Sequence, residues 1–184
     1  MTFFNPFKKK QVSEERFAEI LAEFVIEVMT GDDPLRPLKD SEAIDKILGT
    51  LSENELTLIA WDMLVLNMFM VTRVCQALDI SDSVLDKMHA YLNDILLKAG
   101  QIADNDALKV FEQLLNKRYR EYHASLTNPF DNMSLSRFGD VAVTNMFGEK
   151  YPHINLFLPL MIAGIYNACG HAVKGLIKAY PIKH

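Results

Sequence analysis

Cysteine and basic charge are both scarce in this sequence. Cys75 and Cys169 are the only cysteines in 184 residues, so no disulfide framework is available to hold the fold, and a reducing compartment is expected. The formal net charge is −5, which lacks the basic excess typical of proteins that bind nucleic acids. These two scarcities favour a cytoplasmic protein with no nucleic-acid partner.

Targeting signals are also missing. The three lysines Lys8–Lys10 follow a short apolar stretch, whereas a secretory signal places its charges before a longer apolar run. Residue 2 is Thr2, which excludes myristoylation. Phe3, Phe4 and Phe7 beside the lysines raise one membrane alternative, contact of residues 3–10 with an anionic surface, although packing of the aromatic rings on the protein is favoured.

Motifs for catalysis, cofactors and metals are absent as well. The sequence has no nucleophile elbow, phosphate loop or dinucleotide fingerprint. Asp86 and His89 have the spacing of helical metal ligands, and Cys169 lies close to His171, but a di-metal bundle needs Glu-x-x-His pairs that this chain lacks. We therefore expect no metal and no cofactor, and a binding role rather than catalysis.

What the sequence does contain is helical periodicity. It is 49% hydrophobic and 23% charged, a balance typical of one globular domain. Apolar residues recur with helical spacing throughout, and no segment alternates with a period of two. The sequence predicts an all-α, single-domain bundle of about seven helices over residues 13–184, after an N-terminal arm of residues 1–12. Residues 34–39 are expected to form an ordered loop fixed by Pro34 and Pro37.

Two segments are more apolar than the others. The first covers residues 53–78 and opens with the capping box Ser52-x-x-Glu55, and the second covers residues 152–179. We expect these two helices to form the hydrophobic centre of the bundle, with Pro159 kinking the second or shifting its start. Residues 154–173 have no formal charge and are long enough to span a membrane, but a buried helix is the favoured interpretation.

The second apolar segment contains the candidate ligand or packing site. Gly164, Ala168 and Ala172 fall on one side of the predicted helix and form a stripe of small residues. Such a stripe allows another helix to approach closely or leaves room for a ligand. Asn167 and His171, one turn apart, flank the stripe and are the best polar pair for a pocket.

Asp62 lies inside the most apolar predicted helix and needs a partner if it is buried. Arg118 falls within the apolar arc of the helix near 104–126 and is the first candidate, while Arg137 is the second. For such a pair, removal of the aspartate is expected to destabilise the protein by about 3–5 kcal/mol. The alternative is a narrow solvent-facing strip that Asp62 shares with Glu55, Arg73 and Gln76.

An internal similarity is also present. Asn5-Pro6-Phe7 and Asn128-Pro129-Phe130 are each followed, within a few residues, by a Ser-x-x-Arg-Phe pattern that begins at Ser13 and Ser134. Residues 1–30 and 128–152 could therefore be related by duplication, although turns and helix caps commonly use these residue types.

The function expected from these features is self-association, as a homodimer, or binding of a protein partner. The two very apolar helices, the nine methionines and the net charge of −7 up to residue 99 against +2 beyond it favour this interpretation. The alternative is a helical bundle that binds a small molecule or lipid in a pocket along the Gly164, Ala168 and Ala172 stripe.

Overall fold

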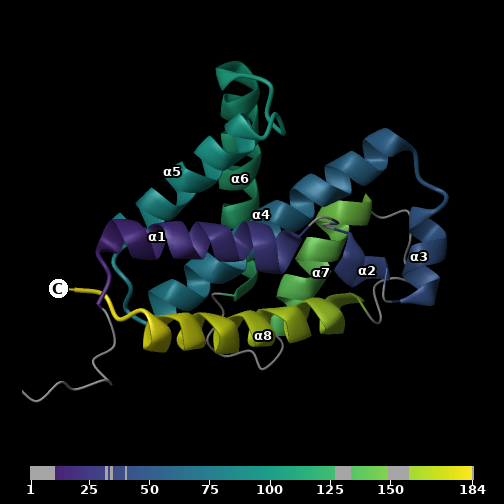
Figure 1. Ribbon diagram of the computed structural model, residues 1–184. Helices are drawn as coiled ribbons and strands as arrows, with labels where there is room; N and C mark the ends of the chain where they lie inside the picture. Colours follow the sequence, from purple (N-terminus) through teal and green to yellow (C-terminus); the bar gives the residue numbers. More distant parts are fainter. Residues whose placement is uncertain are drawn as a thin grey trace, which may run out of the picture.

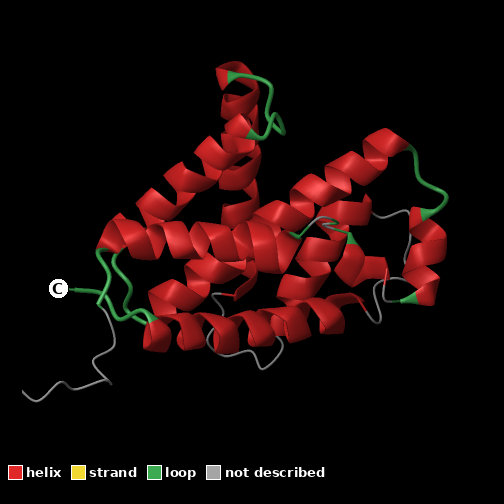
Figure 2. Ribbon diagram, in the orientation of Figure 1, coloured by secondary structure: helices red, strands yellow, loops and turns green. Residues whose placement is uncertain are grey.

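A computed structural model describes residues 11–31, 33, 35–39, 41–126, 134–148 and 158–183, with the backbone alone for residues 28–30 and 43. Within these ranges the chain is helical and contains no strand, so the predicted all-α class is confirmed (Figure 2). The elements are α1 (Glu14–Glu23), the π-helix η1 (Phe24–Thr30), α2 (Arg36–Lys39), α3 (Glu42–Leu48), α4 (Glu53–Ala77), α5 (Asp82–Lys98), α6 (Asn105–Leu126), α7 (Ser134–Phe147) and α8 (Leu158–Ala179).

The hydrophobic centre is α4. Ser52 begins it through the expected capping box: its hydroxyl accepts from the Glu55 backbone N–H, and the Glu55 carboxylate accepts from the Ser52 backbone N–H at 3.0 Å. Every residue from Asp62 to Thr72 is buried. Because this helix is apolar on nearly all sides, it needs neighbours on nearly all sides, and η1, α6, α7 and α8 supply them.

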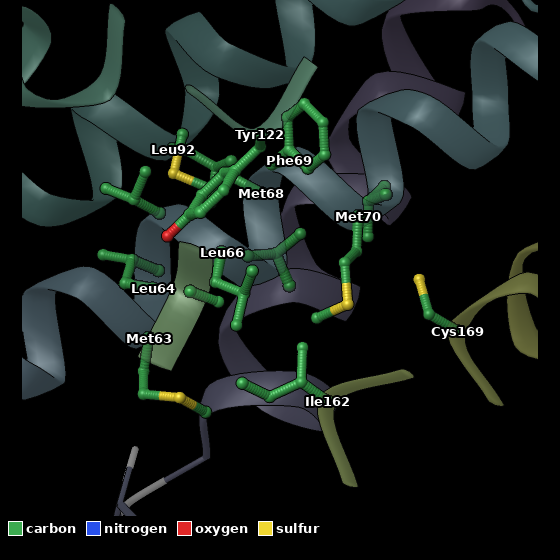
Figure 3. Packing of buried hydrophobic residues seen from close by; sticks show 14 of the residues in the cluster. Met63, Leu64, Leu66, Met68, Phe69, Met70, Leu92, Tyr122, Ile162 and Cys169 are labelled. Carbon is green, nitrogen blue, oxygen red and sulfur yellow. The ribbon is translucent and has the colours of Figure 1, made fainter. Parts of the chain in front are cut away.

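Aromatic rings fill the junction of α4, α6 and α7. Phe69 contacts Tyr119 and Tyr122 of α6 at 5.2 Å between ring centroids, and Phe138 of α7 at 5.7 Å. Figure 3 shows Tyr122 beside Phe69, and Met70 on the side of α4 toward Ile162 and Cys169 of α8. Phe111 and Tyr122 of α6 are therefore in the core.

α7 and α8 make the most extensive helix pair in the molecule. They cross very closely at Gly139, where an added Cβ would lie 2.5 Å from both the Cα and the carbonyl oxygen of Pro159. Pro159 is in the first turn of the described part of α8. The expected earlier start at Pro152 lies outside the described residues.

α8 departs from the expected role of a second central helix. It runs along one side of the bundle (Figure 1), and only Leu158, Pro159, Ile162, Cys169 and Val173 are buried. Of its most apolar 18 residues, 17% are buried, against 78% for α4. By length and composition both helices could cross a membrane, but the burial of α4 identifies it as the core helix of a bundle.

The structure corrects one local prediction and shows one irregular helix. The segment expected as a loop contains the single-turn helix α2, because Pro37 falls in a first turn and the Asp33 carboxylate accepts from the Leu35 N–H at 3.0 Å. The first helix does not remain α-helical to its end, since η1 closes with a bond from the Gly31 N–H to the Ile26 carbonyl at 2.7 Å.

The two ends of the described chain are tied together. The Val12 N–H donates to the Pro181 carbonyl at 3.0 Å, and the Lys183 N–H donates to the Val12 carbonyl at 2.9 Å. Val12, which the sequence placed in the N-terminal arm, therefore joins the helical domain.

Residues 1–10, including the predicted membrane-contact segment, lie outside the described residues, as do residues 128–133 and 149–152 of the predicted duplication.

Candidate functional site

The outer side of α8 is an exposed surface on which small and apolar residues predominate beside two polar ones, Asn167 and His171, and it is called the α8 face below. It consists of Leu160, Gly164, Asn167, Ala168, His171, Ala172 and Gly175, all of which are exposed. Leu160 is 65% exposed, and a Cβ added at Gly164 or Gly175 would meet no atom within 4 Å. The small-residue stripe predicted from the sequence is thus exposed, and no described helix packs against it at Gly164.

Two hollows border the α8 face, and they divide the candidate residues between them. Asn167 and His171 line one hollow of about 280 Å³ together with Val74 at the end of α4. Ala168 and Ala172 line the other hollow, of about 240 Å³, which is also bordered by Phe24, Pro37, Met63, Asn67, Ile165 and Cys169. Gly164 borders neither hollow, so the predicted stripe does not form a single pocket.

Asp62 and Arg118 form a salt bridge between α4 and α6. Arg118 Nε donates to Asp62 Oδ1 at 2.7 Å, and Arg118 Nη2 donates to Asp62 Oδ2 at 3.2 Å, so two parallel hydrogen bonds join the side chains. Asp62 is 6% exposed, which rules out the alternative of a solvent-facing strip. Arg73 instead donates to Gln76 on the same helix at 3.0 Å.

The salt bridge extends into a network that the sequence did not reveal. Arg118 Nη1 donates to Glu121 Oε2 at 3.1 Å and to Asn145 Oδ1 of α7 at 2.6 Å, and Asn145 Nδ2 donates to Glu121 Oε2 at 3.1 Å. Burial raises the pKa of the Asp62 carboxyl, an effect that the nearby guanidinium opposes. The network therefore fixes α4, α6 and α7 relative to one another, and Arg118 supplies the positive charge for two carboxylates.

A second buried polar cluster joins α4, α5 and α6. His89 Nε2 lies 3.0 Å from Tyr119 Oη, and both atoms lie 3.3 Å from Thr72 Oγ1. The Thr72 hydroxyl donates to the Met68 carbonyl at 2.9 Å, so its oxygen is left to accept from the other two groups. Burial lowers the pKa of His89, which favours the neutral imidazole. This cluster was missed because each residue follows ordinary helical spacing, and only the packing of three helices brings them together.

Both cysteines are buried between α4 and α8, and neither is in a disulfide. Burial raises the pKa of the Cys75 and Cys169 thiols to about 12, so both are protonated at neutral pH. Cys75 is a core residue with 0% exposure.

We expect both thiols to be unreactive in the folded protein. At pH 8, an aromatic disulfide reagent such as Ellman's reagent should release less than about a tenth of the two thiol equivalents within minutes, because the reagent attacks accessible thiolates. The same protein in concentrated urea should release both equivalents at once and serves as the control. Rapid reaction of either cysteine in the absence of urea would contradict the burial described here.

Within the described ranges, no group of three or more histidine, cysteine or acidic side chains is placed to hold a metal ion. His89 of the Asp86-x-x-His89 motif is instead engaged with Thr72 and Tyr119. The described fold and surface define the chain as an all-α bundle with one exposed apolar helix face. No protein-family model, curated protein or solved structure matches it.

Proposed function

We propose that this protein acts by binding another protein surface through the α8 face, and that the first such surface is a second copy of the same chain. The observation that carries the proposal is the contrast between the apolar composition of α8 and its exposure: 17% of its most apolar 18 residues are buried. Exposed apolar surfaces of this kind are typical of interaction sites.

The chemistry of the α8 face suits a helix as the partner element. Gly164, Ala168 and Ala172 carry no side chain larger than a methyl group, so a second helix can approach the backbone of α8 closely. Two copies related by a twofold axis would place the same face on both sides of the interface. Asn167 and His171 would then lie beside the contact and supply polar groups at its edge.

The decisive measurement is the mass of the protein in solution. Light scattering coupled to size-exclusion chromatography, at high micromolar concentration, should give the mass of a dimer of the 20.9 kDa chain. Gly164→Arg should give the monomer mass, because the new side chain projects from the centre of the α8 face. A Cβ at Gly164 meets no atom within 4 Å, so the change does not disturb the fold of the monomer.

Val110→Arg is the matched control. Val110 is on α6 and is 66% exposed, so the substitution introduces the same charge at an equally accessible apolar position away from α8. This variant should keep the dimer mass. A monomer mass for the unaltered protein, or a dimer that persists in Gly164→Arg, would overturn self-association through this face.

A small-molecule or lipid site beside the same stripe is the second candidate, supported by the hollow at Ala168 and Ala172. Its volume of about 240 Å³ is below the range of about 300–1,000 Å³ usual for ligand pockets. A small-molecule function is therefore less well supported than protein binding. A thermal-shift screen against metabolites and lipids separates the two: stabilisation by a ligand that is lost in Ala168→Leu supports this candidate.

A further inference from the structure

A further hollow in the described structure lies away from the α8 face. It has a volume of about 530 Å³ and is formed where the N-terminal half of α4 faces the end of α5 and the π-helix η1. That volume falls within the range usual for small-molecule sites. This hollow is called the Trp61 cavity below.

The cavity has a buried floor and a fixed aromatic wall. Leu64 and Leu96, each 4% exposed, form the floor. Trp61 forms part of the wall, and its ring lies 5.3 Å from the ring of Phe111 on α6, which supports it from behind. A rigid apolar wall of this kind is prepared for a ligand without further ordering.

The cavity is open because the residues around its mouth are short. Ala60 of α4 and Ala99 at the end of α5 leave the space unfilled. α5 ends at Lys98, and Gly100 follows with a φ of 68°. The Gly100 and Gln101 N–H groups donate to the Leu97 and Leu96 carbonyls at 3.1 and 3.0 Å. This sharp turn keeps the chain after α5 from covering the cavity.

The lining chemistry defines the class of ligand. Among the described lining residues none is charged, so this part of the lining offers no counter-charge to a carboxylate, phosphate or ammonium group. The Thr57 hydroxyl is already engaged, since it donates to the Glu53 carbonyl at 2.9 Å. Trp61 and Gln101 also line the cavity, and no hydrogen bond within the described residues engages the Trp61 indole N–H or the Gln101 side-chain amide.

We infer that the Trp61 cavity is a binding site for an uncharged small molecule with an aromatic or aliphatic body and a hydrogen-bond acceptor. The apolar body displaces water from Leu64, Leu96 and Trp61, which provides the affinity. The acceptor meets the indole N–H or the Gln101 amide, which fixes the orientation. This site is independent of the α8 face and of self-association.

Trp61 is the single tryptophan of the chain, so its fluorescence reports on the cavity directly. The neutral probe N-phenyl-1-naphthylamine should bind saturably with one site per chain. Because acrylamide quenches by contact, bound probe should lower the acrylamide quenching constant of Trp61 at least twofold. The sulfonated analogue 1-anilinonaphthalene-8-sulfonate has a similar aromatic body and should bind at least tenfold more weakly.

Ala60→Leu fills the cavity and should weaken binding of the neutral probe at least tenfold while the circular dichroism spectrum stays helical. Thr57→Phe, at an exposed lining position, is the second variant and should weaken binding of the neutral probe in the same way. It replaces Ala60→Leu as the test if that variant does not fold. Ala168→Leu fills the hollow beside α8 instead and should leave binding within twofold of wild type.

Four results would overturn the inference. These are no saturable binding of the neutral probe, undiminished binding in the folded cavity variants, loss of binding in Ala168→Leu, and equal or tighter binding of the sulfonated analogue.

Discussion

Replacing Arg118 with methionine is expected to lower the free energy of unfolding by about 3–5 kcal/mol at pH 7. Arg118 is the only described cation that contacts Asp62, which is 6% exposed within the most apolar helix of the molecule. Methionine keeps much of the packing volume but leaves the carboxylate buried without its counter-charge. Urea denaturation followed by circular dichroism measures the loss.

The same variant should show a characteristic dependence on pH. Burial already raises the pKa of the Asp62 carboxyl, and loss of the guanidinium raises this pKa further. The folded variant then binds a proton at a pH where the unfolded chain does not. The loss of unfolding free energy relative to wild type is therefore complete at pH 7. This loss becomes smaller as the pH falls through the raised pKa toward the ordinary carboxyl pKa near 4.

Two comparisons isolate the salt bridge. Asp62→Asn should cost less than Arg118→Met, about 1–3 kcal/mol, because Glu121 and Asn145 still accept from the guanidinium. This revises the 3–5 kcal/mol that the sequence suggested for loss of the aspartate. The double variant should be more stable than Arg118→Met alone, since no unpaired carboxylate remains.

Lys46→Met, which removes an exposed pair with Glu42 at 2.7 Å, should stay within about 0.5 kcal/mol of wild type. An Arg118→Met loss as small as that of Lys46→Met would contradict the buried network.

The second large effect is expected at Gly139. Gly139→Ala should destabilise the protein by about 1–3 kcal/mol, even though alanine is the better helix former. The new Cβ would lie 2.5 Å from the Pro159 Cα and carbonyl oxygen, which are backbone atoms and cannot rotate away. Relief therefore requires α7 and α8 to move apart, which loosens the most extensive helix pair in the structure.

Gly170→Ala provides the matched control on α8. Its added Cβ would meet only the Val74 Cγ2 atom, at 3.9 Å, an ordinary van der Waals contact. This variant should be as stable as wild type or gain up to about 1 kcal/mol from helix propensity. Thermal and urea denaturation of the two variants side by side test the prediction. Equal stability of Gly139→Ala and Gly170→Ala would show that the helices do not cross as closely as described.

Much of the secondary structure could be predicted because it depends on local chemistry. The capping box at Ser52 and Glu55 and the apolar spacing along α5 and α6 are set by residues three or four apart, which any helix brings together. The exceptions have a local cause as well. Pro37 is tolerated in the first turn of a helix as readily as in a loop. The residues of η1 suit an α-helix as well as a π-helix.

The position of Asp62 could also be interpreted from the sequence, because a carboxylate on an apolar helix requires a partner and Arg118 occupies an apolar arc. The additional partners Glu121 and Asn145 could not be predicted, since neither residue is unusual on its own helix. Thr72, His89 and Tyr119 illustrate the same limit: their hydrogen bonds join residues 17 to 47 positions apart in the chain.

The sequence by itself determined that the chain is an all-α bundle, because hydrophobic spacing and helix caps act within a few residues. It placed both residues 53–78 and residues 152–179 at the hydrophobic centre. Only the tertiary structure decided which apolar helix is covered. α4 and α8 are both long and apolar, yet α4 is surrounded and α8 is covered on one side, because burial depends on how many neighbours the packing supplies. The same packing left the Trp61 cavity open and left the stripe of Gly164, Ala168 and Ala172 exposed. No local sequence pattern specifies either outcome.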